Sequence, residues 1–600
     1  MLCKLCDSLN VADLLKLAKA NSGKVSSSDD YLYFEHHKRY DDLVTAASSG
    51  YQPKFIDDIQ IGQFVTDEDL ATDANFDIAR GWMNTCIAEH SILKCPSFED
   101  KVLPSRVINV GSEDTNPSLL VTNGLRGKYT ALSHCWGGQI ETILTTSNLQ
   151  SLQKGIKITS LPASFRDAIL ITRALGFQYL WIDSLCIIQD SKYDWGIESK
   201  NMGETYRKSV LTIRAAAAHK ATDDSGSDDI VEIASSISRP EDLALLFASG
   251  PLQSRAWALQ ERILSPRILW YGRRQIYWQC PCGFQSANGM PSGGRGYPSS
   301  KLYTYPVITQ RILFNQNYND GLTRFSEEEL LEINCEYQSI VMDYCTRTLS
   351  YPNDKFPAFS GIAALLHKVI GGHYLAGIWS KFFRENLLWH ASKSRAPYTQ
   401  QYRAPSWYWA VTDEGMSHFY VNSSRLESTP YDPILLSHHI ELSSENPYGA
   451  VKYAYIIVDT LTLKLIHLGS IAFQNSFTNA KLRTSYRHDW DEKIPNWSAV
   501  SPFKYKVMLV GFEKRSENYR DSTPVLESGS CLKCLILQED PEDAKKDRKA
   551  GLGCMAGFRL LGKRDPKVDL NWNLTEDGMW FSRSFTEIMN KDLFPFRFFY

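Results

Sequence analysis

The chain has 600 residues, of which 43% are hydrophobic and 12% aromatic, which is enough for about two to four domains with large cores. Its 65 basic and 68 acidic residues nearly balance, so no nucleic-acid or anionic-membrane partner is expected. An apolar run of about 18 residues is absent, which argues against a transmembrane helix, and the N-terminus does not have the pattern of a secretory signal. The 13 cysteines are therefore expected to be reduced thiols of a cytoplasmic protein, without a structural disulfide.

The first 125 residues contain cysteines and a histidine that are chemically suited to zinc. Cys3 and Cys6 form a Cys-x-x-Cys pair, and Cys86, His90 and Cys95 follow much later. Thiolates and imidazole are the usual ligands of tetrahedral zinc. The alternative is that Cys86 and His90, four residues apart on a helix, face the core or its rim. The sequence leaves zinc binding open, and we assign no metal to the chain from it.

Strands and helices are predicted to alternate between Lys128 and Ala218. An apolar run that stops at Trp136-Gly137 predicts the first strand, and the later apolar runs predict two more. Helical periodicity of the apolar residues predicts a helix that begins near Pro162 and ends before Gly176. A second helix is predicted from the spacing of Glu198, Met202 and Tyr206. This alternation is typical of a parallel sheet with covering helices, with strands predicted near 129–134, 179–184 and 210–215 and the first helix over 162–175.

The remaining chain is predicted to alternate between structured and polar segments. The acidic, serine-rich part of residues 219–250 predicts an exposed loop inserted in the domain. We then expect a helix over 254–264, a hairpin of strands 268–271 and 275–279, and a linker over 285–300. Cys280-Pro281-Cys282 is interpreted as an inert pair. Further on, the patterns predict amphipathic helices over 334–349 and 359–371, and strands around 454–458, 506–510 and 531–537.

Four blocks of this sequence occur in the same order in a known family. The chain resembles the heterokaryon incompatibility (HET) domain of filamentous fungi. Two positions differ from what is more common there: His134 replaces a tyrosine, and Gly138 replaces an acid. The blocks that carry the resemblance are Ala131 to Gly137, Asp167 to Gly176, Leu180 to Gln189 and Arg255 to Arg262.

The resemblance implies a fold and a domain organisation. HET domains are distantly similar to Toll/interleukin-1 receptor (TIR) domains, so a flavodoxin/TIR-like parallel α/β sheet is expected. A helical region should follow, and the alternating apolar runs beyond residue 415, where the resemblance ends, predict a β-rich C-terminal domain. The expected boundaries are 1–125 for a Cys/His-bearing leader that includes the start of the HET domain, 126–285 for the HET domain, 286–415 for the helical extension and 416–600 for the β-rich domain.

The resemblance also implies a function. HET-domain proteins are associated with vegetative incompatibility, in which non-self recognition between fused fungal cells leads to programmed cell death. We expect the domain to act by assembling with itself or with a protein partner. No cofactor is expected.

An enzymatic alternative comes from the similarity to TIR domains that cleave NAD. Those enzymes use the glutamate of a Trp-x-x-x-Glu helix, and Trp257 and Glu261 have that spacing. A carboxylate there stabilises the oxocarbenium-like transition state of nicotinamide–ribose cleavage. Glu261 is thus the candidate catalytic residue, NAD the candidate substrate, and ion pairing of Glu261 with an arginine the structural alternative. The candidate ligand-binding residues are Ser133, His134, Trp136, Asp183 and Trp257. For Asp183 the alternative is that its carboxylate caps the next helix or holds a loop.

Overall fold

The computed structural model divides the chain into two compact units, which are described separately. The first consists of Met1–Trp195, Glu204–Ser254 and Glu261–Asn315, and the second of Gly196–Gly203, Arg255–Gln260 and Gln316–Tyr600. The structure describes residues 54–56, 59–61, 69–90, 95–138, 140–218, 250–288, 325–391, 402–413, 415–418, 426–427, 432–460, 462–464, 484–488, 505–513, 530–539, 546–558 and 595–599.

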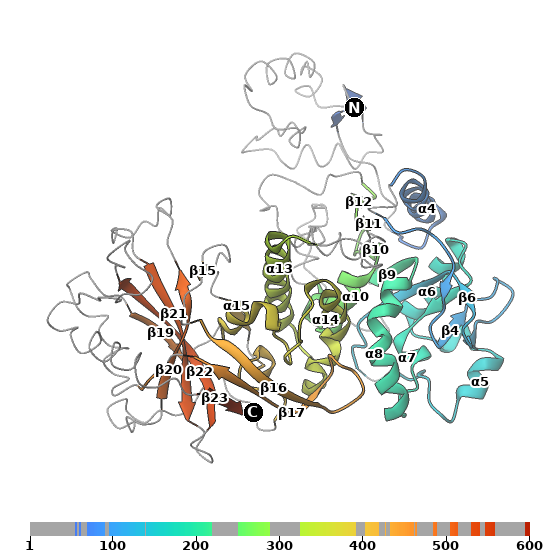
Figure 1. The fold of residues 1–600 in the computed structure, drawn as a ribbon. Coiled ribbons are helices and arrows are strands. Elements are labelled where there is room, and N and C mark those ends of the chain that lie inside the picture. The colour runs from blue at the N-terminus through green and yellow to red at the C-terminus, as the bar shows by residue number, and fades with distance from the viewer. Residues whose placement is uncertain are drawn as a thin grey trace, which may run out of the picture. The chain divides into compact units, whose positions relative to one another are not determined.

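The centre of the first unit is an eight-stranded mixed sheet (Figure 1). Its strand order is β12-β11-β10-β9-β7-β8-β4-β5. The three predicted strands correspond to β7, β8 and β9, and β7 pairs parallel to both of the others, which confirms their predicted direction. The strands are β4 (Arg106–Asn109), β5 (Ser118–Val121), β7 (Tyr129–Ser133), β8 (Tyr179–Trp181), β9 (Leu211–Ala215), β10 (Ile268–Tyr271), β11 (Ile276–Cys280) and β12 (Gly283–Ser286).

The sheet that was expected to be parallel is mixed, because strands at both of its edges run antiparallel to their neighbours. β10 joins β9 in parallel and extends the parallel part to four strands. On one side β11 and β12 follow β10 through short turns, and on the other side β4 pairs antiparallel with both β8 and β5. A strand that follows its neighbour through a tight turn must run antiparallel to it, whereas parallel neighbours need long crossovers. The predicted hairpin is confirmed in β10 and β11.

Burial explains why the central strands are apolar throughout instead of alternating. All five residues of β7 and all five of β9 are buried, as expected where both faces of a parallel sheet are covered. Helices contact the sheet at several strands: α4 (Asp73–Ala88) at β11, α5 (Leu149–Lys154) at β5, α6 (Ala163–Ala174) at β8 and α7 (Asp183–Cys186) at β4.

Helix α6 agrees with the predicted helix over 162–175. Phe165, Ile169 and Thr172 of its periodic face are at most 1% exposed. Gly176 adopts a φ of +79°, a conformation that glycine takes without a steric cost, and its N–H donates to the carbonyl of Arg173 to end the helix. The sequence signals for both ends of this helix are therefore confirmed.

The apolar run after α6 is a shorter strand than the sequence predicts. β8 ends at Trp181, and the chain turns into α7 at Asp183. One carboxylate oxygen of Asp183 accepts the N–H of Ser184, and negative charge at a helix N-terminus favours the turn. The next helix, α8 (Lys192–Lys208), buries Glu198, Met202 and Tyr206, as their spacing predicts.

The predicted helix over 254–264 begins later than expected. A 3₁₀ turn, η2 (Pro251–Ser254), comes first, and α10 runs over Trp257–Leu264. Linker sequence was predicted from residue 285, but β12 extends to Ser286. Two further short strands, β3 (Lys101–Val102) and β6 (Arg126–Gly127), pair antiparallel, as do β1 (Lys54–Ile56) and β2 (Ile59–Ile61).

The second unit contains two long helices, α13 (Glu327–Cys345) and α14 (Pro357–Ile370). The predicted helix over 334–349 starts too late and ends too late. A capping box between Ser326 and Glu329 starts α13 earlier, because it satisfies backbone N–H groups there. The helix over 359–371 is confirmed in α14. Aromatic side chains fill the core between these helices, where Phe359 packs edge-on against Tyr337 and Trp409.

Shorter elements follow in the second unit. They are η3 (Pro352–Lys355), η4 (Ser380–Phe382), α15 (Phe383–Leu387), η5 (Trp409–Val411) and the paired strands β13 (Trp389–Ala391) and β14 (Met416–His418). A nine-stranded sheet includes the three strands predicted near 454–458, 506–510 and 531–537. Its members are β15 (Leu426–Glu427), β16 (Ile434–Leu442), β17 (Val451–Asp459), β18 (Thr462–Lys464), β19 (Thr484–His488), β20 (Tyr505–Glu513), β21 (Ser530–Glu539), β22 (Lys546–Phe558) and β23 (Pro595–Phe599).

Some sequence predictions lie outside the described residues. These are the polar insertion apart from its last residue, most of the linker, and the Cys3–Cys6 pair. Among the described helices, none has the length and apolar character needed to cross a membrane.

Candidate functional site

The candidate residues of the first and third sequence blocks lie at the carboxyl edge of the parallel strands. β7 ends at Ser133, and His134 and Trp136 follow it directly. β8 ends at Trp181, and Asp183 follows two residues later. Because β7 and β8 are parallel neighbours, their carboxyl ends meet at one edge, which is where ligands bind in open α/β sheets.

Asp183 is the centre of this edge. Its Oδ2 accepts a hydrogen bond from the indole Nε1 of Trp136 at 2.9 Å, and its Oδ1 accepts from the backbone of Ser184 at 2.7 Å. The Nε2 atom of His134 lies 3.9 Å from Oδ1. The structure thus brings together three predicted residues, His134, Trp136 and Asp183. Both carboxylate oxygens accept hydrogen bonds from the protein itself, as the structural alternative for Asp183 requires.

Exposure differs among these three side chains. The Asp183 side chain is 17% exposed and that of His134 only 2%, whereas Trp136 is half-buried. The His134 ring packs edge-on against Phe165 of α6 with ring centroids 5.0 Å apart. Trp136 and Asp183 are therefore the members of the group that solvent or a partner reaches.

Ser133 takes part in a different set of contacts. Its Oγ accepts a hydrogen bond from Nη1 of Arg214, at 3.0 Å, and both side chains are fully buried. The guanidinium lies 4.8 Å from the centre of the Trp270 ring, and the Trp270 indole donates to Gln279. A row of polar contacts thus crosses β7, β9, β10 and β11. Arg214 was not among the predicted site residues, although an arginine within the apolar strand β9 is a visible signal.

Glu261 and Trp257 share helix α10, as their spacing predicts. Glu261 is 3% exposed, and its main-chain carbonyl accepts a hydrogen bond from the hydroxyl of Ser265. The half-buried Trp257 donates from its indole nitrogen to Asp354 within the second unit, at 3.4 Å. Trp257 is therefore engaged in holding η3 of that unit.

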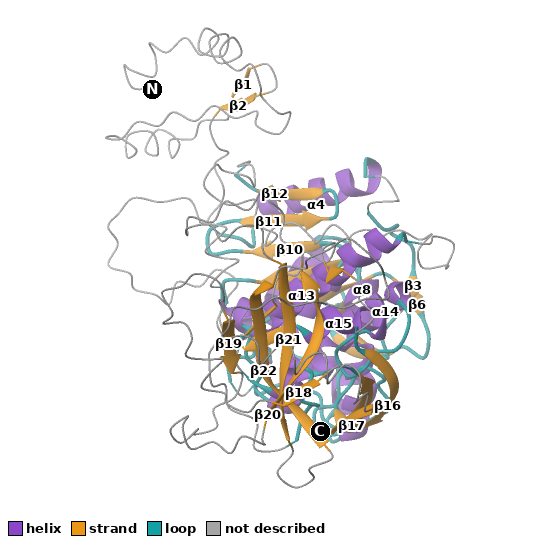
Figure 2. Ribbon diagram, turned by 60° about the vertical axis from the view of Figure 1, so that its left-hand side comes forward, coloured by secondary structure: helices purple, strands orange, loops and turns teal. Residues whose placement is uncertain are grey.

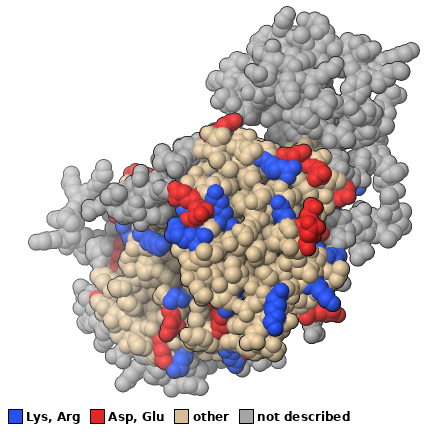
Figure 3. Space-filling model, turned by 90° about the vertical axis from the view of Figure 1, so that its right-hand side faces the viewer, with Lys and Arg blue, Asp and Glu red and all other residues tan. Residues whose placement is uncertain are grey.

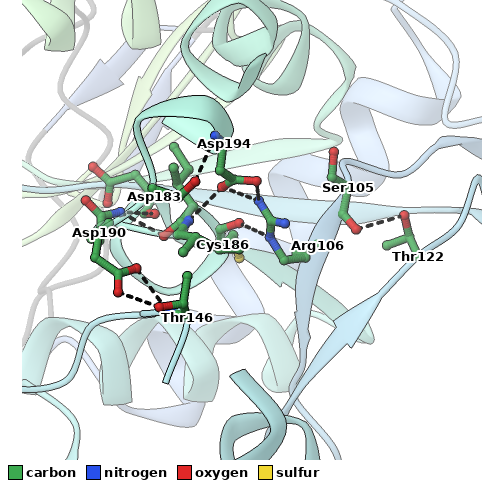
Figure 4. A network of polar contacts seen from close by, with 12 residues as sticks. Ser105, Arg106, Thr122, Thr146, Asp183, Cys186, Asp190 and Asp194 are labelled. Atoms are coloured by element: carbon green, nitrogen blue, oxygen red, sulfur yellow. Dashed lines mark hydrogen bonds and ion pairs between the residues drawn. The ribbon is translucent and has the colours of Figure 1, made fainter. Parts of the chain in front are cut away.

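A polar network holds the segment that follows Asp183 (Figure 4). The Nη2 atom of Arg106 contacts both carboxylate oxygens of Asp194, and its Nε donates to the carbonyl of Cys186. Asp190 accepts hydrogen bonds from the hydroxyl and the backbone N–H of Thr146, and these lower the pKa of Asp190. Residues of β4, of α8 and of the loop before α5 thereby hold the segment that follows Asp183 in place.

Three residues of the leader come together with a cysteine that was not predicted as a zinc ligand. Cys86, His90 and Cys95 cluster with Cys280, the last residue of β11. His90 lies beyond the end of α4, so the two residues do not share a helix, although Cys86 is buried and His90 half-buried as the structural alternative requires. Cys280 of the Cys280-Pro281-Cys282 segment belongs to this cluster, whereas the interpretation of that segment as inert stays a prediction.

Charge is distributed evenly over the face of the molecule that Figure 3 shows. Lysine and arginine side chains alternate there with aspartate and glutamate, and no continuous area of one sign forms on that face.

The chain matches a known protein family over part of its length. The family model described as Heterokaryon incompatibility protein (HET) matches residues 129–261. No curated protein and no solved structure matches the chain. The matched segment begins with β7 and ends at Glu261, so it includes Ser133, His134, Trp136 and Asp183. Residues 129–261 of this chain are a HET domain, the domain of heterokaryon incompatibility proteins.

Proposed function

We propose that this protein acts in fungal vegetative incompatibility, as a cytoplasmic effector of non-self recognition that triggers programmed cell death through assembly of its HET domain. The observation that carries the proposal is the family match over residues 129–261. Assembly involves either a second copy of the chain or a protein partner. We also propose that the C-terminal part of the chain is a β-rich domain. The second unit either recognises the non-self signal or restrains the HET domain.

A flavodoxin-like arrangement of the HET domain is part of this proposal. The four parallel strands have the spatial order β8-β7-β9-β10. The first of these four along the chain, β7, therefore lies between the second, β8, and the third, β9. This is the order of the first four strands in flavodoxin-like sheets, which place their ligands at the switch between the first and third strands. Ser133 and Arg214 lie at that switch, and both are buried. We propose the relationship to TIR domains on the basis of the same strand order.

The contacts of Asp183 and the burial of Glu261 favour assembly over catalysis. The carboxylate of Asp183 orients the loop of Trp136 and the first turn of α7. Glu261, the candidate catalytic residue, is only 3% exposed. A carboxylate that attacks or stabilises a substrate needs access to it. A glutamate that is buried in this way supports the fold of the domain.

NAD cleavage is the second candidate function, because Trp257 and Glu261 lie on one helix with the spacing of the TIR motif. In that mechanism the Glu261 carboxylate stabilises the positive charge that develops on the ribose as nicotinamide leaves. Ser133, His134, Trp136 and Asp183 would line the substrate site. The two functions differ in whether NAD falls before cells die.

The test is induced expression of the full chain in a filamentous fungus, with viability, cellular NAD and the oligomeric state of the protein followed over the same time course. We expect death and a higher oligomer, with NAD unchanged until cells lose viability. The Glu261→Gln variant keeps the shape and removes the charge, and we expect it to kill as wild type does.

Two outcomes would contradict the assembly proposal. The first is early NAD loss that Glu261→Gln abolishes while the variant stays folded, which would establish the enzyme. The second is killing by a protein that stays monomeric throughout. An exposed substitution on the same unit, Tyr193→Ala, controls for expression level, because this side chain is 80% exposed on α8.

A further inference from the structure

Four side chains from three separate parts of the first unit converge with the geometry of a metal site. Cys86 lies near the end of α4, His90 and Cys95 follow that helix, and Cys280 ends β11. Their ligand atoms all lie within 4.8 Å of one another. The Nδ1 atom of His90 is 3.4 Å from the sulfur of Cys95 and 3.5 Å from the sulfur of Cys280.

These separations correspond to the edges of a coordination tetrahedron. With zinc–sulfur bonds of about 2.3 Å and a zinc–nitrogen bond of about 2.0 Å, tetrahedral angles place sulfur and nitrogen about 3.5 Å apart. The three thiols are at most 3% exposed, and the imidazole is half-buried. Such a site is closed, because the protein supplies four ligands and leaves no position for a substrate or a water molecule.

A buried arginine indicates that this cluster carries negative charge. Arg267 is 2% exposed, and its Nε donates to the sulfur of Cys86 at 3.1 Å. It also donates to the carbonyl of Pro96 and stacks over the ring of Phe98. Among the described residues no carboxylate forms an ion pair with this guanidinium. A buried cation requires an anion nearby, and the thiolate of Cys86 is the one that the structure places there.

The charge of a zinc centre with these four ligands also fits the buried Arg267. Thiolate is the form that binds metal. With zinc bound, three thiolates and one neutral imidazole leave a net charge of about −1 on the centre, which the guanidinium of Arg267 balances.

We propose that Cys86, His90, Cys95 and Cys280 bind a structural zinc ion that fastens α4 to the antiparallel edge of the sheet. Figure 2 shows α4 beside β11 and β12, and α4 contacts β11. β11 and β12 lie outside the segment that matches the HET family, so the site joins parts of the chain on either side of that match. Zinc is favoured over other metals because tetrahedral sulfur-rich sites with imidazole select it.

The neighbouring Cys282 provides a matched control. Its sulfur lies 3.5 Å from that of Cys95, yet Cys282 is exposed and is not one of the four residues that surround the centre. The Cys282→Ser variant changes one sulfur to oxygen two residues from a proposed ligand. It should leave metal binding intact, whereas Cys280→Ser should abolish it.

The experiment measures metal content of the purified full chain, expressed with added zinc and desalted, by mass spectrometry. We expect about one zinc per chain in wild type and in Cys282→Ser, and less than about a tenth of that in Cys280→Ser and His90→Ala. Reconstitution with Co²⁺ should give the visible bands of tetrahedral cobalt and a thiolate-to-cobalt charge-transfer band. If Cys280→Ser does not fold, the His90 variants decide, because that side chain is half-buried: His90→Cys should keep the metal that His90→Ala loses.

The proposal fails if wild type retains neither zinc nor cobalt. It also fails if His90→Ala retains as much metal as Cys282→Ser. A disulfide between Cys95 and Cys280 or Cys282, found by peptide mapping of the metal-free protein as purified, would show that these sulfurs are a redox pair instead.

Discussion

Arg106 and Asp194 connect strand β4 of the central sheet to helix α8 through a charged pair whose side chains are only 11% and 15% exposed. The guanidinium reaches both carboxylate oxygens, at 2.7 and 2.6 Å, and the same carboxylate accepts the backbone N–H of Ile188. Arg106 lies on β4, before the start of the HET match, whereas Asp194 lies within it. The domain is therefore stabilised by residues outside the family segment.

Breaking this pair should cost considerable stability. Asp194→Asn leaves the Arg106 charge without its partner, and loss of one member of a buried pair costs about 3 kcal/mol. The control is Glu99→Gln, which removes a carboxylate from the exposed pair with Lys101 and should cost less than about 1 kcal/mol. Urea unfolding of the two variants measures both effects. Equal losses would mean that the Arg106–Asp194 pair adds nothing beyond a surface contact.

The extent of the folded unit can be tested with fragments. A fragment of residues 129–261 lacks β4 and β5 on one edge of the sheet and β10 to β12 on the other, so β8 and β9 would become exposed edge strands. We expect this fragment to be insoluble or to unfold without cooperativity. Residues 69–288 contain the whole sheet and should unfold in a cooperative thermal transition, measured by circular dichroism. A cooperative transition in the shorter fragment would contradict the prediction.

The sequence predicted local features better than long-range ones. Helix α6 and the β10–β11 hairpin follow from periodicity and turn residues, which act over a few positions. β8 was predicted too long, because an apolar run does not show that Asp183 starts a helical turn. The grouping of His134, Trp136 and Asp183 was predictable because parallel neighbouring strands end at one edge. Cys280 was missed because its distance from Cys95 in the sequence hides that β11 lies beside α4.

Removal of the hydrogen bond between Trp136 and Asp183 distinguishes a structural role of Trp136 from direct contact of its indole with a partner. Trp136→Phe keeps an aromatic ring and removes the indole donor, which should lower stability by about 1 kcal/mol, the usual net value of one hydrogen bond. The melting temperature and the extent of cell killing should decline together if Trp136 acts by holding the loop. Killing that disappears while the melting temperature stays unchanged would show that the indole contacts a partner. Leu170→Ala serves as the control, because Leu170 is 42% exposed on α6.

Asp354 gives the second unit a dependence on pH that has a definite sign. Burial raises the pKa of this carboxyl from 3.8 to about 6, although the hydrogen bond from Trp257 acts in the opposite direction. The folded state therefore binds the proton more tightly than the unfolded chain does. The resulting stabilisation is full below pH 3.8 and is lost as the pH rises through about 6.

Replacing this carboxyl with an amide should remove that loss. Asp354→Asn cannot ionise and still offers an oxygen to the Trp257 indole, so we expect it to be more stable than wild type at pH 7 and about equal to it at pH 4. Urea midpoints measured across this range test the sign. Glu332→Gln, which removes an exposed carboxylate on α13, should shift the midpoint little at either pH. A larger gain for Asp354→Asn at pH 4 than at pH 7 would show that the Asp354 carboxylate is stabilised in the folded state.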